Sequence, residues 1–342
     1  MRKDINRFSD GLRIRMINKI KYLPRNVNRL FNQRHSNDFS MSVGAAGAVS
    51  QCDINEAGVG VLFDPCILRA DANYYMYVSD RDNDAIVRLT SADGQSWCDL
   101  HTVLSASISG IEWCQKINRA HVCFHNEKWK MWFTGMTENW SAIGYAESSD
   151  GLSFKQVFDG PILIPDKTIE NNSVMNPCVL IEDGGYRMWY ASGGLFEPDV
   201  ICEAISADGL KWEKVKLPSL SAGMEPYDKH KVGGCDVKRM SDGRLALFYI
   251  GYQNLDVARI CLAISSDNGE NWIRSEENPI VCPLKESWCA HAVYKPSVLF
   301  DDSQNVDIWF NGRKWNYEGI GHCSFSYEAL FGGEGFERAE HR

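Results

Sequence analysis

Five polar or charged residues stand at or near the start of five repeated segments, and their side chains could do chemistry. They are Asp64, Arg119, Asn176, Asp236 and Lys295. Carboxylates can act as a base, a nucleophile or a proton donor, while arginine and lysine bind anionic groups. If the fold brings these residues together, the sequence predicts a site that combines acid–base groups with cations.

The elements that must position these residues follow from the repeat. Successive segments lie 55 to 61 residues apart, and an aromatic strand such as Tyr186 to Tyr190 follows each segment. A Ser-x-Asp turn such as Ser206-Ala207-Asp208-Gly209 comes next in four of the five repeats. This period accommodates a four-stranded sheet with its loops. The sequence therefore predicts an all-β fold, a five-bladed β-propeller with one blade for each repeat.

The expected order of strands places the candidate site. The propeller is predicted to span residues 46–335, between a short basic extension at 1–45 that could form a helix and a C-terminal tail at 336–342. Residues 43–57 are interpreted as a linker into the first blade. In each blade the first strand should lie innermost, so the opening residues of the five first strands would line a central funnel. The Ser-x-Asp turns would lie on the opposite face as structural turns.

Nearly the whole predicted propeller resembles the five-bladed propeller glycosidases of the arabinanase, xylosidase and β-fructosidase type (families 43, 32 and 68). It resembles more distantly the mannoside phosphorylases of family 130. The resemblance rests on Asp64-Pro65, on the strands Trp129 to Phe133 and Tyr186 to Tyr190, and on the Ser-x-Asp-Gly turns. It implies a base or nucleophile at Asp64, an orienting carboxylate in the third blade and an acid Glu near the fourth.

Two positions depart from that family pattern. The third-blade position is Asn176 instead of Asp, and the fourth-blade segment Gly233-Gly234-Cys235-Asp236 lacks the expected Glu. Asp236 is therefore one candidate for the general acid. Other candidate carboxylates lie on the loops that precede the second and fourth blades: Glu112, Glu225 and Asp228.

Cationic and aromatic residues on the same face suggest what the funnel could bind. The expected substrate-binding residues are Arg119, His121, Asn176, Lys295, Arg313, His291, Trp288 and Glu112. Converging Arg and Lys suit a phosphate or a carboxylate sugar, although Arg119 and Lys295 could instead form an internal ion network with Asp64 and Asp236. Trp288 could stack on a sugar ring or pack between blades. The sequence predicts no metal site and no cofactor.

Charge and cysteine content restrict the partners and the compartment. The 342-residue chain has a net charge of −9, yet residues 1–38 hold ten Lys or Arg and only three Asp, a charge of +7. The overall acidity argues against a nucleic-acid binder, while the basic extension could contact an anionic membrane surface. No secretory signal or transmembrane run is recognisable, and the twelve cysteines suit buried thiols in a reducing compartment. We therefore expect a cytoplasmic protein.

Three functions are compatible with these observations. The first is a glycosidase that acts on a furanoside or related glycan in the central funnel. The second is glycosyl transfer or phosphorolysis, with a phosphorylated or nucleotide-activated sugar in polysaccharide assembly. The third is a non-catalytic glycan-binding propeller. The resemblance and the position of Asp64 rank the glycosidase first, although fold alone does not determine function.

Overall fold

The described part of the chain consists almost entirely of β-strands. The structure is a computed structural model that describes residues 49–54, 60–70, 72–106, 113–182, 184–195, 198–215, 218–301 and 304–332. The basic extension, the C-terminal tail and Glu112 lie outside the described residues. Within those ranges the only helix is α4 (Tyr327–Phe331), and none is long and apolar enough to cross a membrane. The all-β prediction is confirmed.

Consecutive strands pair antiparallel within four sheets, one of which joins two groups of strands through a parallel pairing of Ser173 with Ser141. In chain order the strands fall into five groups, which are called units below. The first unit comprises β3 (Leu62–Ala70), β4 (Asn73–Asp80), β5 (Ala85–Ser91) and β6 (Ser96–Ser105). The second comprises β7 (Lys116–His125), β8 (Lys128–Met136), β9 (Ser141–Ser148) and β10 (Lys155–Gln156). The third comprises β11 (Ser173–Glu182), β12 (Gly185–Gly193), β13 (Pro198–Ser206) and β14 (Glu213–Lys214). The fourth comprises β15 (Lys231–Arg239), β16 (Leu245–Tyr252), β17 (Ala258–Ser265) and β18 (Ile273–Arg274). The fifth comprises β19 (Ala292–Phe300), β20 (Asn305–Lys314) and β21 (Tyr317–Ser326).

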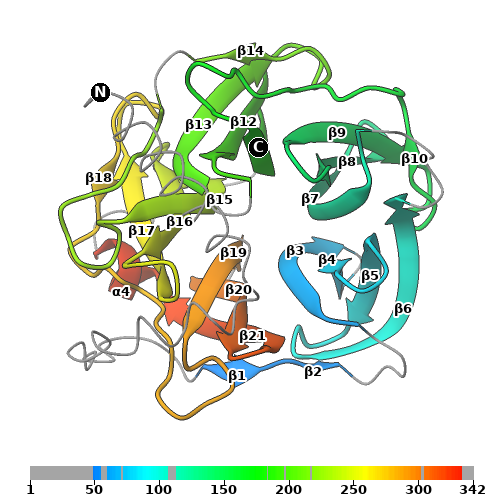
Figure 1. Cartoon of the computed structure of the whole chain (residues 1–342). Coiled ribbons are helices and arrows are strands. Elements are labelled where there is room, and N and C mark those ends of the chain that lie inside the picture. The colour runs from blue at the N-terminus through cyan, green and yellow to red at the C-terminus, as the bar shows by residue number, and fades with distance from the viewer. Residues whose placement is uncertain are drawn as a thin grey trace, which may run out of the picture. The chain divides into compact units, whose positions relative to one another are not determined.

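The first strands of the units surround a central axis. β3 contacts β7, β7 contacts β11, and the same holds for β11 with β15, β15 with β19, and β19 with β3. Figure 1 shows the units arranged around this axis, with β3, β7, β15 and β19 nearest to it. The propeller architecture and the innermost position of the first strands are therefore confirmed. The count of five blades stays a prediction, which this circular order of contacts supports.

A strand from the N-terminal side of the propeller completes the last unit. β1 (Ser50–Gln51) pairs with β21, with Ser50 opposite His322. The next strand, β2 (Asp53–Ile54), pairs in parallel with β6 of the first unit. The interpretation of residues 43–57 as a linker is therefore wrong for these two short strands. The pairing explains why the fifth repeat lacks a Ser-x-Asp turn, since its outer strand comes from elsewhere in the sequence.

Each inner strand carries a β-bulge at the repeated residue. The pairing register shifts between Phe63 and Cys66 in β3, and at the equivalent place in the other four inner strands. In four units the bulged residue has a left-handed φ: Asp64 (56°), Arg119 (56°), Asn176 (53°) and Lys295 (51°). These four are called the bulge residues below. Such a conformation costs an L-residue about 1–2 kcal/mol, and bulges commonly re-aim a side chain beside a functional site.

The side chain two residues beyond each bulge joins neighbouring units around the axis. These coupling residues are Cys66, His121, Cys178, Asp236 and Ser297, and each hydrogen-bonds the backbone of the next inner strand. The contacts are Val122 N to Cys66 Sγ (3.3 Å), His121 with the backbone of Val179, Val237 N to Cys178 Sγ (3.2 Å), Val298 N to Asp236 Oδ2 (2.7 Å) and Ile67 N to Ser297 Oγ (2.8 Å). The circle therefore closes from the fifth unit to the first.

The Ser-x-Asp turns provide a second set of contacts between units. In the first turn, Ser91 Oγ accepts the Gly94 N–H at 2.9 Å, and the indole Nε1 of Trp309 in the fifth unit donates to the Gly94 carbonyl at 2.7 Å. Tyr77 and Trp132 donate in the same way to the turn glycines of the next units. A Cβ on Gly94, whose φ is +75°, would lie 2.9 Å from the Trp309 ring. These turns therefore have the structural role expected for them.

Removing the closing contact between the fifth and first units should weaken the fold. Ser297→Ala leaves the buried Ile67 N–H without its acceptor, and we expect it to lower the free energy of unfolding by about 1–3 kcal/mol. The midpoint of urea denaturation measures this loss. The control is Ser153→Ala on the exposed surface, which should stay close to wild type. Equal midpoints for the two variants would show that the coupling contact contributes nothing.

Candidate active site at the propeller axis

The Asp64 carboxylate is the centre of the axial site. The side chain is buried, with 5% of the residue surface exposed. Arg119 Nε lies 3.1 Å from its Oδ2, and Asn176 Nδ2 donates to the same oxygen at 3.4 Å. With its amide nitrogen towards the axis, Asn311 donates to Oδ1 at 3.0 Å and to the Tyr294 carbonyl at 3.1 Å. Side chains from four different strands thus meet at one carboxylate, as predicted for Asp64, Arg119 and Asn176.

Neighbouring units hold the bulge residues in their left-handed conformation. The Arg119 N–H donates to Ser79 Oγ at 2.8 Å, and the Asn176 N–H donates to Thr134 Oγ1 at 3.1 Å. In both cases the acceptor is on the second strand of the preceding unit, directly after its aromatic stretch. Strained residues persist when their surroundings fix them, and they cluster at functional sites. These contacts with the preceding unit therefore fix the backbone of Arg119 and Asn176 at the bulge.

Asp236 lies among the coupling residues and has the properties of a structural carboxylate. It accepts the Val298 N–H, and Lys238 Nζ lies 3.1 Å from its Oδ1. Although burial acts to raise its pKa, the charges of Lys238 and Lys295 and the bond from Val298 lower the pKa overall. A general acid needs a raised pKa. These contacts argue against Asp236 as the proton donor, and its role as an acid stays a prediction.

His121 is likewise one step deeper than the bulge residues. Its pKa is lowered from 6.5 to about 3, mainly by burial; the charge of Asp236 opposes this shift, and the charges of Lys238 and Lys295 add to it. The imidazole is therefore neutral at ordinary pH and cannot hold an anion by charge. Its hydrogen bond to the Val179 backbone makes it a residue that joins two units.

Lys295 and Arg313 are buried cations of the fifth unit. Lys295 Nζ donates to the carbonyls of Cys235 at 3.2 Å and Pro296 at 3.4 Å. Arg313 Nη2 donates to the Asp256 carbonyl at 2.9 Å, whereas its Nε finds no acceptor among the described residues. His291 lies beside Arg313, whose carbonyl accepts the His291 N–H, and its Nδ1 accepts the Trp315 N–H at 2.9 Å.

Other predicted site residues lie away from Asp64 or pack in the core. The Trp288 ring stacks on Phe310 with 6.1 Å between ring centres, in space left by Gly312 and Gly321. This arrangement favours the packing role for Trp288. Glu225 is exposed on the loop before β15, where its backbone carbonyl accepts the Asp228 N–H. It keeps the accessibility that a proton donor from a loop would need.

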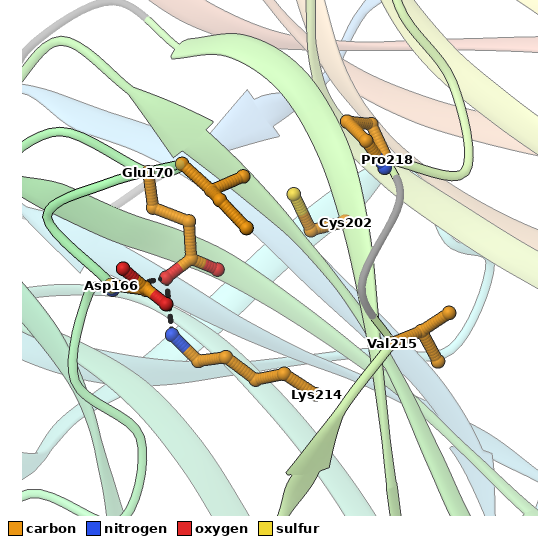
Figure 2. A pocket seen from close by; sticks show the side chains of 7 residues that line it. Asp166, Glu170, Cys202, Lys214, Val215 and Pro218 are labelled. Carbon is orange, nitrogen blue, oxygen red and sulfur yellow. Dashed lines mark hydrogen bonds and ion pairs between the residues drawn. The ribbon is translucent and has the colours of Figure 1, made fainter.

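Asp228 belongs to a structural arrangement that occurs twice. Tyr249 Oη and Arg274 Nε donate to its Oδ2 at 2.8 and 2.7 Å, which argues against Asp228 as an acid. In the third unit Tyr190 Oη donates to Glu170 at 2.6 Å, and Lys214 forms an ion pair with Glu170. Figure 2 shows Glu170 and Lys214 of this second arrangement among the residues that line a small pocket. Because β14, which carries Lys214, is the outer strand of its unit, the pocket lies away from the axis.

Sequence reasoning missed two residues that contact the axial carboxylates. Asn311 follows the aromatic stretch of β20 at the position that Ser79 and Thr134 occupy in their units. A polar residue at this point of a buried strand is the signal that could have revealed it. Lys238 pairs with Asp236 across one strand position, and alternation along β15 could have placed both on one face.

Comparisons with known proteins support the fold. No family model matches the chain. The protein described as "Uncharacterized protein Rv1502" from Mycobacterium tuberculosis is 28% identical over 204 residues, which cover 56% of this chain and 63% of that protein. The chain thus aligns with less than two thirds of the length of this relative.

Two solved structures have the same propeller architecture. A thermostable family-43 glycoside hydrolase has a TM-score of 0.63 at 17% identity, covering 78% of this chain and 90% of that one. A β-1,2-mannobiose phosphorylase from Listeria innocua, in complex with β-1,2-mannobiose, has a TM-score of 0.63 at 13% identity, covering 81% and 93%. At this identity the likeness shows the fold alone. The expected resemblance to the propeller glycoside hydrolases is confirmed at that level.

The neutral state of His121 predicts a pH dependence of stability. An unfolded histidine takes up a proton below its ordinary pKa of 6.5, whereas the folded chain resists protonation down to about pH 3. The lowered pKa therefore contributes stability above pH 6.5 that is lost as the pH falls towards 3, by at most about 1.4 kcal/mol for each pH unit. Melting temperatures between pH 7 and 4 should fall less steeply for His121→Gln than for wild type. Parallel curves would contradict this, and His101→Gln on the exposed surface is the control.

Proposed function

We propose that the chain is a carbohydrate-active enzyme of the glycoside hydrolase type, with its reacting groups at the propeller axis and Asp64 as base or nucleophile. Two features support this proposal. The fold is that of propeller glycoside hydrolases and of a propeller phosphorylase. In the described part of the chain, nitrogen donors from three other strands surround the Asp64 carboxylate, which stands at the position that the family resemblance assigns to the base or nucleophile.

The observation that carries the proposal is the strained, buried setting of Asp64. Its φ of 56° places a side chain on the axis where a regular strand would not, and Arg119, Asn176 and Asn311 fix its two oxygens. A carboxylate held by nitrogen donors is oriented for attack on, or proton removal beside, a bound sugar. A packed core would gain more from an apolar residue at this position than from a buried charge.

The proton donor is expected from a loop above the axial opening. Asp236 is occupied between units and Asp228 is paired with Arg274. Glu225, exposed on the loop before β15, is the remaining described candidate of those that the sequence named. We propose Glu225 as the acid and a furanoside or related glycan as the substrate. Hydrolysis by two carboxylates requires the donor to face Asp64 across the bound sugar.

We also propose five blades within residues 46–335 and a cytoplasmic location. The circle of contacts among β3, β7, β11, β15 and β19 supports the five blades. All twelve cysteines fall within the described ranges as free thiols, and ten of them are buried. Free thiols in this number are typical of a reducing compartment. The predicted contact of residues 1–38 with a membrane lies outside the described residues.

Asp64→Asn tests the proposal directly. The amide keeps the size of the side chain and tolerates a left-handed φ, but it can neither take a proton nor attack as a nucleophile. Turnover of a panel of nitrophenyl furanosides and pyranosides should fall at least about a hundredfold, while the melting temperature changes little.

The matched control for this experiment is Asp99→Asn. Asp99 also has a φ of 56°, but it is exposed on the outer strand β6, so its substitution should leave turnover unchanged. Full turnover in Asp64→Asn would refute the assigned role. If the wild type binds glycans but turns none over, the non-catalytic glycan-binding function replaces the enzyme.

A further inference from the structure

The axial site carries more positive charge than Asp64 and Asp236 neutralise. Among the described residues, Asp64 is paired with Arg119 and Asp236 with Lys238, each at 3.1 Å. Lys295 is also buried there, and in that part of the chain no carboxylate oxygen lies within 4.0 Å of its ammonium group. Asp64 and Asp236 are thus already paired with other cations, and the positive charge of Lys295 remains without a carboxylate partner among the described residues.

The contacts of Lys295 leave its charge only partly compensated. The ammonium group donates to two backbone carbonyls, and 4% of the residue surface is exposed. The charge of Asp236 attracts it, but Lys238 is the cation that contacts this carboxylate. A buried ammonium is costly unless a counter-charge and hydrogen bonds compensate it. Lys295 is moreover held at a left-handed φ, which an ordinary packing residue would not need.

Arg313 provides the second, independent observation. Only 9% of its surface is exposed, its Nε has no acceptor among the described residues, and no carboxylate there lies within 4.0 Å of its guanidinium. It lies two positions beyond Asn311 on β20, so alternation puts both side chains on one face. Since Asn311 contacts Asp64, Arg313 belongs to the same face of the site. A buried N–H that lacks an acceptor is suited to receive one from a ligand.

We infer that the axial opening binds a sugar bearing an anionic group, a phosphate or a carboxylate, and that Lys295 and Arg313 hold this group while Asp64 faces the sugar. A guanidinium presents several N–H donors in one plane, and an ammonium adds a compact charge, so together they match the oxygens of either anion. The inference rests on the proposed function for the position of the sugar. The charge of the site itself does not depend on catalysis.

Calorimetric titration at low ionic strength tests the inference. The probes are a hexose 1-phosphate, a hexuronate, inorganic phosphate and the uncharged hexose. We expect at least one anionic sugar to bind at least about tenfold more tightly than the uncharged hexose. The hexose phosphate and hexuronate arms distinguish the two sources of the anion, and inorganic phosphate tests whether the sugar is needed. Equal affinity for charged and uncharged sugars, or no binding of either anionic sugar, would overturn the inference.

Three variants assign the effect to the two cations. Arg313→Gln and Lys295→Met should each weaken binding of the anionic sugar at least about tenfold. The control Lys314→Gln removes a charge from the next residue along β20, which contacts the Glu286 carbonyl outside the site, and should bind like wild type. If Arg313→Gln and Lys295→Met both bind like this control, the assignment is wrong.

Stability separates a binding role from a structural one. Lys295→Met keeps the length of the side chain but removes a buried charge, so its melting temperature should equal or exceed that of wild type while binding is lost. A variant that loses stability together with binding would point to a structural lysine.

Asp64→Asn keeps this inference distinct from the proposed function. It should lose turnover yet bind the anionic sugar at least as tightly as wild type, since a negative charge leaves the opening. If Asp64→Asn turns over normally, the proposed function fails, whereas the titrations still decide whether the site binds an anion.

Discussion

The left-handed residue at the bulge of four of the five inner strands is the constraint on which the axial site depends. At Asp64, Arg119, Asn176 and Lys295 the chain adopts a conformation that L-residues avoid. The extra residue shifts the strand register, so the bulge residue and the coupling residue two positions later lie at successive levels of the axis. Hydrogen bonds from the bulge backbone to the preceding unit, as from Arg119 to Ser79, offset part of the strain. One local distortion thus builds both the site and the contacts that close the ring.

The bulge residues and the coupling residues have different roles. The bulge residues form the candidate site, and the coupling residues hold neighbouring units together. Side chains at the coupling level are committed to the next unit, as Asp236 is to Val298 and Ser297 to Ile67. A group with this commitment cannot also exchange protons with a substrate without loosening the ring. At the bulge level, by contrast, Arg119 and Asn176 contact the Asp64 side chain and not the backbone that closes the circle. We therefore expect reactive groups only among residues whose side chains do not join neighbouring units.

The sequence repeat was sufficient to predict the propeller fold and the set of bulge residues. It did not show how far along the axis each polar residue lies. Because Asp64, Arg119 and Asn176 open equivalent segments, the sequence repeat predicted that they meet at the axis. Asp236 was grouped with them, although it aligns with Cys66 and Ser297 one level deeper. The two-residue strand β1 has no periodicity to recognise, so the closure of the fifth unit was not predicted. Asn311 was missed because its role arises from a neighbouring strand far away in the sequence.

The departure at Asn176 connects the charge of the site to its distance from the glycosidase pattern. A carboxylate there would face Asp64 Oδ2 at 3.4 Å and repel it, whereas the amide donates to the same oxygen. The exchange removes one negative charge from the opening and leaves Arg119 as the direct counter-charge of Asp64 alone. Among the described residues, neither Lys295 nor Arg313 has a carboxylate of its own to pair with. The amide at Asn176 thus adds no negative charge beside Asp64, which agrees with the anionic sugar that we infer as the ligand.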